Sequence, residues 1–152
     1  MTPPAAEHIH SLEIPLAGYS LLIPSASIAE VANPTEMYPV PGAAAWVIGV
    51  IGWRAQAVPI VAFEALIGGA VPEVSAESKI VVFYPFSGRR DRGFYALLSL
   101  AEPRPQVVSA GSIEPEDPAQ LPDTPLIGAG VKIKGRTLFI PDFDALQRAF
   151  YP

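Results

Sequence analysis

Short apolar runs, separated by proline, glycine and charged residues, recur along the whole chain. Runs of this kind, bounded by turn residues, are typical of β-strands. The pattern predicts strands over residues 19–24, 27–31, 47–53, 58–63, 79–84, 94–100, 131–133 and 137–140. Polar or charged reversals at 54–56, 87–93 and 134–136 join the last six of these strands into three hairpins. The chain is therefore expected to be an all-β protein with many turns.

Helical structure is expected at only two places. Residues 64–67 form one helical turn, which Gly68 and Gly69 end. The carboxylate of Asp142 can accept a hydrogen bond from first-turn amides, so that a last helix begins after it. The apolar face of that helix comprises Phe143, Leu146 and Phe150.

Two segments lack a clear strand pattern. Residues 1–13 are expected to be a flexible N-terminal arm, with an edge strand as the alternative. Residues 102–125 are rich in proline and acidic side chains, and they are expected to be mostly loop. Gly49 and Gly52 fall inside the strand 47–53 and indicate a bulge or a close backbone approach. The remaining chain, residues 14–152, is expected to be one folded domain.

An internal repeat relates the two halves of the chain. A shift of eighty residues places RAQAVPIVAFEAL, residues 54–66, over KGRTLFIPDFDAL, residues 134–146. Each copy consists of a basic turn, an apolar strand and a short helix. Repeats of this kind indicate similar structural units, and neither half is large enough to bury a sufficient core alone. Two similar β units packed on each other are therefore expected.

The composition excludes several classes of function. Half of the residues are hydrophobic and 16% are charged, so the chain is too apolar to be disordered. The net charge of −5 argues against non-specific nucleic-acid binding, which needs clustered lysines and arginines. The absence of cysteine rules out disulfides and thiol catalysis and agrees with a reducing compartment. The longest uncharged runs, 14–29 and 37–53, are too short for a membrane span and contain prolines. No leader pattern is visible, and a cytoplasmic protein is expected.

No catalytic constellation is visible in the sequence. It contains neither a G-x-S-x-G nucleophile motif nor a phosphate-binding loop. His8 and His10 would share one face of a strand, but no third metal ligand lies near them in sequence. No enzyme activity, metal or cofactor is therefore expected. A small enzyme that uses one of the two histidines stays as an alternative.

Arg54 is the one basic residue in the apolar segment 47–66. Tyr38, Trp46 and Trp53 lie near it in sequence. They are either core aromatics or, together with Arg54, an exposed patch of the composition enriched at binding hot spots. A small β-barrel that binds nucleic acid by base stacking is an alternative function, and the acidic net charge disfavours it.

The order of these motifs resembles CheW-like chemotaxis coupling domains. SIAEV (27–31), YPVP (38–41) and VIGVIGWRAQAVPIVAFEAL (47–66) resemble the signature of the family in the first half. FYALLSL and LIGAGVKIKGRTLFIPDFDAL continue the similarity, which covers residues 15–150. The short acidic chain is most similar to the stand-alone adaptors, among them the ChpC- and PilI-like proteins of type IV pilus (twitching) systems.

The resemblance implies a fold and a function. Such domains consist of two packed five-stranded SH3-like β-barrels with short helical turns, and a C-terminal helix is expected here. They are non-catalytic adaptors that bind the regulatory domain of a CheA-type histidine kinase and the cytoplasmic tip of a chemoreceptor. These two proteins are the expected partners, with no nucleic acid and no direct membrane insertion. Exposed strand edges leave self-association open.

The resemblance also implies partner-binding residues. Glu30 matches the acid after the second strand of the family and Arg54 matches the arginine of its hairpin, two positions associated with signalling contacts and with each other. Ile28 occupies an apolar position implicated in partner binding. The predicted partner-binding residues are Ile28, Glu30, Val31, Trp53 and Arg54.

Four positions depart from the family pattern. Gly52 replaces an asparagine, Trp53 a leucine, Ala55 a glycine and Ala62 an aspartate, whereas the second copy keeps that acid as Asp142. These are turn and rim positions, so the fold is expected to survive and the choice of partner to differ.

Overall fold

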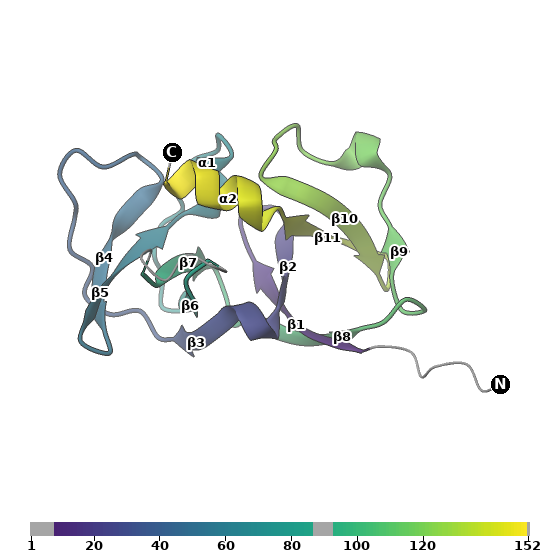
Figure 1. The fold of residues 1–152 in the computed structure, drawn as a ribbon, viewed down its shortest axis with the longest axis horizontal. Helices are drawn as coiled ribbons and strands as arrows, with labels where there is room; N and C mark the ends of the chain where they lie inside the picture. The colour runs from purple at the N-terminus through teal and green to yellow at the C-terminus, as the bar shows by residue number, and fades with distance from the viewer. Residues whose placement is uncertain (1–7, 87–92, 152) are drawn as a thin grey trace.

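The computed structural model describes residues 8–86 and 93–151 (Figure 1). This part of the chain contains eleven strands in two sheets, two α-helices and two short 3₁₀ helices. The predicted all-β fold with a C-terminal helix is confirmed. Residues 1–7 of the expected arm, and all of the expected turn at 87–93 except Gly93, lie outside the described residues.

The first sheet combines the two ends of the chain. Its strand order is β8-β1-β2-β11-β10-β9. The strands are β1 (Ile9–Pro15), β2 (Ser20–Pro24), β8 (Arg104–Val108), β9 (Glu114–Pro115), β10 (Ile127–Ile133) and β11 (Arg136–Pro141). All neighbours run antiparallel except β2 and β11, which pair in parallel. Figure 1 shows the purple N-terminal strands beside the green C-terminal ones on one side of the molecule.

The second sheet is built from the middle of the chain, in the order β3-β6-β7-β5-β4. Its strands are β3 (Ile28–Ala32), β4 (Val47–Trp53), β5 (Gln56–Val61), β6 (Lys79–Phe83) and β7 (Tyr95–Ser99). Five strands were expected in each barrel, and the second sheet has five. The first has six, because β8 and the short β9 extend its two ends. The two units are therefore not the two halves of the chain, since β1 and β2 join the C-terminal strands.

Each short helix follows one sheet and packs against the other. Helix α1 (Phe63–Leu66) follows β5, and its Glu64 accepts a hydrogen bond from the amide of Ala17 in the β1–β2 turn, at 3.0 Å. Helix α2 (Phe143–Phe150) follows β11, and its Phe150 contacts the rings of Trp46 and Tyr95 beside the second sheet. Figure 1 shows α2, in yellow, crossing from one sheet to the other. Because each helix packs against the sheet that it does not follow, the two helices hold the sheets together.

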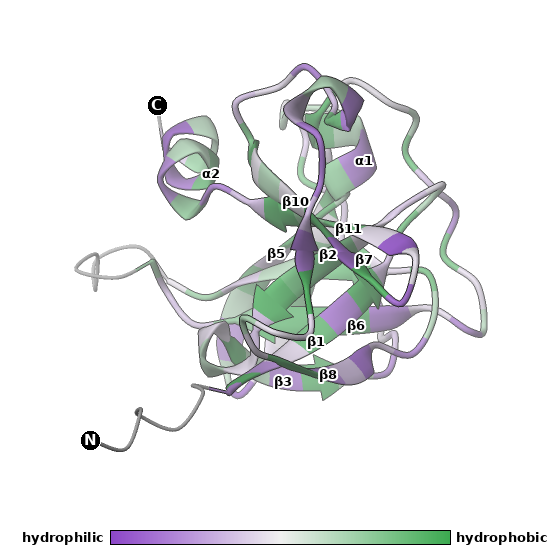
Figure 2. Ribbon diagram, turned by 90° about the vertical axis from the view of Figure 1, so that its right-hand side faces the viewer, coloured by the Kyte–Doolittle hydropathy of each residue, from purple (hydrophilic) through white to green (hydrophobic). Residues whose placement is uncertain are grey.

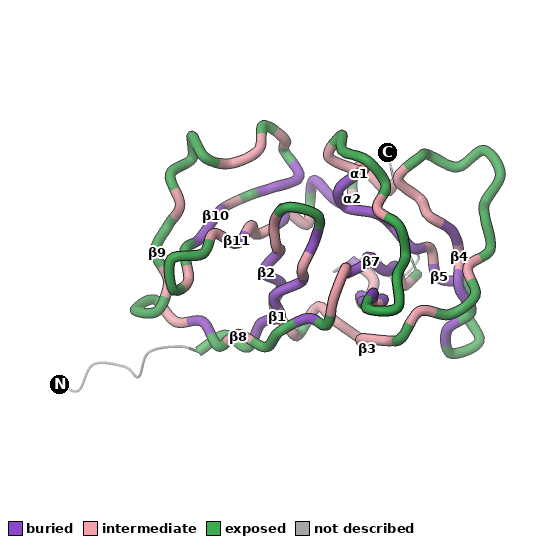
Figure 3. The backbone as a smooth tube through the Cα atoms, turned by 180° about the vertical axis from the view of Figure 1, so that it is seen from behind, coloured by how far each residue is buried: buried purple, intermediate pink, exposed green. Residues whose placement is uncertain are grey.

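Buried apolar side chains form three clusters. One lies inside the first sheet around Leu138, and another inside the second sheet around Ile60. The largest cluster draws on both sheets and both helices, and includes Leu21, Phe83 and Leu146. Figure 2 shows hydrophobic residues concentrated in the strands, and Figure 3 shows buried stretches in the strands of both sheets. Because the largest cluster is shared, either sheet alone would expose much of its apolar surface.

Two segments that were expected to be irregular contain strands. Residues 9–13 of the predicted arm belong to β1, which lies between β2 and β8. The pattern hid this strand because Ser11 and Glu13, both polar, occupy its buried positions. The predicted loop 102–125 contains β8 and β9. Pro105 is tolerated in β8 because that strand lies at the edge of its sheet.

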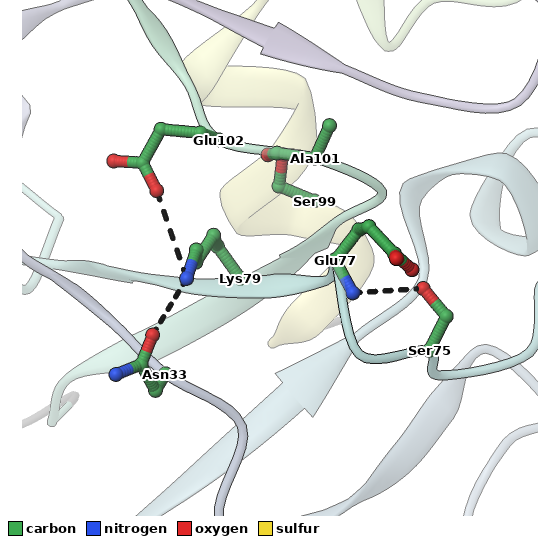
Figure 4. A network of polar contacts seen from close by, with 7 residues as sticks. All are labelled: Asn33, Ser75, Glu77, Lys79, Ser99, Ala101 and Glu102. Carbon is green, nitrogen blue, oxygen red and sulfur yellow. Dashed lines mark hydrogen bonds and ion pairs between the residues drawn. The ribbon is translucent and has the colours of Figure 1, made fainter.

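A polar network fixes the end of β3 against the segment that leads from β7 to β8 (Figure 4). The ammonium group of Lys79 on β6 donates a hydrogen bond to Oδ1 of Asn33 at 2.6 Å. It also lies 3.7 Å from a carboxylate oxygen of Glu102. The hydroxyl of Ser99 donates to the carbonyl of Ala101 at 2.6 Å in the same segment. Lys79 on β6 thus links the end of β3 to the segment between β7 and β8, which connects the second sheet to the first.

Candidate partner-binding site

The β4–β5 hairpin ends in a tight turn that displays Arg54. The register pairs Trp53 with Gln56, so Arg54 and Ala55 are the two turn residues. Both have positive φ, 47° and 59°, as a type I′ turn requires, and glycine or asparagine adopts this conformation at least cost. The second copy of the repeat forms an equivalent turn at residues 134–135, with φ of 51° and 79°. The arginine and the alanine are held in a conformation that disfavours both.

Glu30 on β3 contacts both residues at the end of β4. Its Oε1 accepts a hydrogen bond from Nη2 of Arg54 at 3.2 Å, and its Oε2 accepts one from Nε1 of Trp53 at 3.2 Å. Since β3 and β4 are the two edges of the second sheet, these contacts join its edges and close the barrel through side chains. The side chains of Arg54 and Glu30 are 60% and 41% exposed, so both can reach a partner.

Trp53 supports this ion pair from beneath. It is buried, its ring centroid lies 4.8 Å from that of Phe94, and the guanidinium carbon of Arg54 lies 4.4 Å from its ring centroid. A cation at this distance from an aromatic face is attracted by the ring. Of the two interpretations left open by the sequence, the core aromatic holds for Trp53, whereas Tyr38 is exposed. Trp53 therefore orients Arg54 and Glu30 and offers little contact surface itself.

Ile28 and Val31 lie on another side of β3. The register of β3 with β6 shifts between Ile28 and Glu30, which turns the strand locally. Ile28 and Val31 are half-buried and pack against the cluster between the two sheets, whereas Ala29 packs against the cluster inside the second sheet. The structure thus brings Glu30, Trp53 and Arg54 together, and it separates the two aliphatic residues from them.

An exposed tyrosine extends the site beyond the predicted residues. Tyr84, directly after β6, is exposed, and its ring lies 6.0 Å from that of Phe94, which in turn contacts Trp53. The signal in the sequence was the aromatic pair that ends one strand and begins the next, FY at 83–84 and FY at 94–95. The Arg54 face is defined here as Glu30, Trp53, Arg54, Tyr84 and Phe94. It combines an ion pair with aromatic surface.

The histidines stand apart from this site. His8 and His10 are exposed at the start of β1. Within residues 8–86 and 93–151, no three His, Cys, Asp or Glu side chains gather closely enough to hold a metal ion. In the same part of the chain, no helix has the length and apolar character needed to cross a membrane.

Comparison with known protein families gives a match to the CheW-like domain over residues 11–150. The chain belongs to the CheW-like domain family. Members of this family are adaptors and not enzymes, in agreement with the expectation from the sequence. Among solved structures, the scaffolding protein TtCheW from Thermoanaerobacter tengcongensis is similar in fold, with a TM-score of 0.73, 18% identity and 90% of each chain covered. No curated protein sequence matches this CheW-like chain.

Proposed function

We propose that this CheW-like chain is a cytoplasmic adaptor that couples the cytoplasmic tip of a chemoreceptor to the regulatory domain of a CheA-type histidine kinase. Family membership supports a role in chemotaxis coupling. The observation that carries the proposed contact is Arg54 at φ 47°, exposed and oriented by Glu30 and Trp53.

Coupling of this kind works by mutual positioning and needs no chemical step. An adaptor that binds two partners at once sets their relative positions, and the affinity for each then depends on the other. Arg54 contributes a planar cation with several N–H donors, of which Glu30 engages one. The remaining donors fit carboxylate or carbonyl acceptors on the partner. The neighbouring Tyr84 and Phe94 offer aromatic surface to the same partner.

Titration calorimetry with the purified kinase regulatory domain tests this proposal through a charge-reversal cycle. Arg54→Glu is expected to weaken binding at least tenfold, a loss of about 1.4 kcal/mol. Glu30→Arg is expected to weaken it as well, because Arg54 loses its partner and meets a like charge. Thermal unfolding of Arg54→Glu should change little, since an exposed ion pair contributes at most about 1 kcal/mol. Glu30→Arg also removes the acceptor of the buried Trp53 indole N–H, so a somewhat lower unfolding temperature is expected for that variant.

The double variant Glu30→Arg/Arg54→Glu distinguishes a direct contact between Arg54 and the kinase from an ion pair that acts only within the adaptor. It restores opposite charges inside the chain but presents them in reversed order. It is expected to bind as poorly as Arg54→Glu alone. Recovery of the affinity of the unmodified chain would mean that the pair acts only within the adaptor and that Arg54 is not read by the kinase.

The type IV pilus branch forms a second part of the proposal, and it rests on the resemblance to stand-alone twitching adaptors. Deletion of the gene in its source organism is expected to abolish surface twitching and to leave swimming intact. The opposite phenotype would assign the adaptor to a flagellar system.

A further inference from the structure

Glu64 carries a carboxylate that is buried but only half engaged. The residue is 4% exposed, and its Oε2 accepts the hydrogen bond from the amide of Ala17. Among the described residues, Oε1 has no hydrogen-bond partner and no lysine or arginine forms an ion pair with Glu64. A buried acceptor without a hydrogen-bond donor is destabilising, so its presence in a folded protein needs an explanation, and one explanation is a function.

A second unsatisfied polar atom belongs to Tyr19. Its hydroxyl is buried and, within the described part of the chain, has no hydrogen-bond partner. Its ring packs against Phe139 at a centroid distance of 5.7 Å. Burial, and then the negative charge of Glu64, raise the pKa of Tyr19, which keeps its proton at neutral pH. In the part of the chain that the structure describes, the two buried polar side-chain atoms without partners are therefore the neutral hydroxyl of Tyr19 and the carboxylate oxygen Oε1 of Glu64.

Both side chains line one open groove of about 420 Å³, called the α1 groove below. Its other walls are Ala17, Ile67, Gly68, Gly69 and Ala70. The glycines end α1 in a Schellman motif, with the Gly69 amide on the Glu64 carbonyl at 2.8 Å and the Gly68 amide on the Ala65 carbonyl at 3.1 Å. A Cβ at Gly69 would lie 2.9 Å from that Glu64 carbonyl. The backbone that ends α1 thus forms one side of the groove.

The internal repeat shows that this burial is not required by the shared unit. Asp144 on α2 corresponds to Glu64, and it is exposed. An acid at this helix position can therefore face solvent, as it does in the second copy. In the first copy the acid is instead buried, and it lines a groove together with Tyr19.

We propose that the α1 groove binds a basic side chain, arginine or lysine, presented by a partner protein. Oε1 of Glu64 is the anionic acceptor, the Tyr19 hydroxyl is a second acceptor, and Ile67 covers the aliphatic stem. The net charge of −5 favours the approach of a basic ligand. The whole of β5 separates this groove from Arg54, so the inference is independent of the proposed contact at the Arg54 face.

Amide NMR titration with a blocked pentapeptide, Gly-Gly-Arg-Gly-Gly, tests the groove directly. Saturable shifts are expected at the amides of Ala17, Gly68 and Gly69. The same peptide with neutral citrulline in place of arginine should bind several-fold more weakly, because only the guanidinium carries the charge. Absence of saturable shifts at these amides in the unmodified chain would overturn the proposal.

Three variants locate the binding groups. Glu64→Gln keeps an acceptor for the Ala17 amide but removes the charge, and it is expected to abolish the shifts. Tyr19→Phe keeps the ring contact and should weaken binding several-fold. Asp144→Asn is the matched control, since it neutralises the equivalent acid on the other helix, and it should leave the titration unchanged. Retention of the shifts by Glu64→Gln would also overturn the proposal.

A stability measurement separates a binding group from a structural one. In the free chain Glu64→Gln is expected to unfold at the same temperature as the unmodified protein or higher, because it removes a buried charge without a full set of partners. A marked fall in the unfolding temperature would show that the carboxylate is already satisfied inside the chain. The α1 groove would then have no free anionic acceptor to offer.

Discussion

Ala55→Gly is expected to stabilise the protein, because the β4–β5 turn holds an alanine at φ 59°. A non-glycine residue in the left-handed region costs about 1–2 kcal/mol. Glycine also destabilises the folded state by about 0.5–1 kcal/mol, because it increases the entropy of the unfolded chain, and this offsets part of the gain. The net gain in the free energy of unfolding is about 0–1.5 kcal/mol, with a central value of about 0.75 kcal/mol. For a chain of this length the central value raises the unfolding temperature by about 1.5–3 °C.

Urea and thermal denaturation, followed by circular dichroism, measure this change. Gly135→Ala is the reverse substitution in the matched turn, where φ is 79° and a Cβ would meet no atom within 4 Å. Any loss of stability there comes from the backbone alone, and it should be of similar size. A neutral Gly135→Ala, or an Ala55→Gly variant that is less stable than the unmodified chain, would refute the argument from turn strain.

Three further predictions concern the first sheet and the C-terminal helix. Asp142→Ala removes the carboxylate that caps α2 through the amide of Ala145 at 3.1 Å, and thermal unfolding should show a loss of about 1 kcal/mol; an unchanged unfolding temperature would contradict the cap. Arg136→Gln leaves Glu13, which is 1% exposed, with only the neutral side chains of Gln106 and Ser20 as donors among the described residues, and urea unfolding should show a loss of about 3 kcal/mol. A loss below about 1 kcal/mol would contradict this. Burial would raise the pKa of Glu13, but hydrogen bonds from Arg136 and Gln106 hold it below its usual value of 4.5. Its ionised form therefore adds stability that is present above about pH 4.5 and is lost as the pH falls through the lower native pKa. Glu13→Gln should flatten this acid limb of the stability curve, and an unaltered slope would contradict the assignment.

Much of the second sheet could be predicted from local pattern. Its strands are continuous apolar runs between turn residues, so length and flanking residues were sufficient to find them. Gly49 also behaves as predicted, since the register of β4 shifts beside it and a Cβ there would lie 2.8 Å from the Tyr38 carbonyl. Gly52 meets no such neighbour, and no structural need for it is evident.

The first sheet could be predicted only in part. Its strand β1 buries Ser11 and Glu13, and the latter is acceptable there only because Arg136 reaches it from β11. That partner is distant in sequence, so the local pattern at Glu13 gives no sign of it. The parallel pairing of Leu21 with Phe139 likewise joins distant segments and makes one sheet from both ends of the chain. The repeat indicated two similar units but not this exchange.

The candidate sites could likewise be predicted only in part from the sequence. The pairing of Glu30 with Arg54 followed from the family resemblance, and the contact is present at 3.2 Å. The burial of Trp53 beneath it depends on Phe94 from a different hairpin, which no local pattern specifies. The burial of Glu64 was also unpredictable, because its copy Asp144 has similar neighbours in sequence and yet faces solvent.

The most direct test of the adaptor function compares two charge reversals at matched turns. Arg54→Glu and Lys134→Glu make the same change in net charge at the first residue of equivalent turns on the two sheets. Calorimetric titration with the kinase regulatory domain should show a dissociation constant at least tenfold larger for Arg54→Glu than for the unmodified chain. The dissociation constant for Lys134→Glu should be nearly unchanged. Equal affinities for both variants and the unmodified chain would contradict the assignment of the Arg54 face as the surface that binds the kinase.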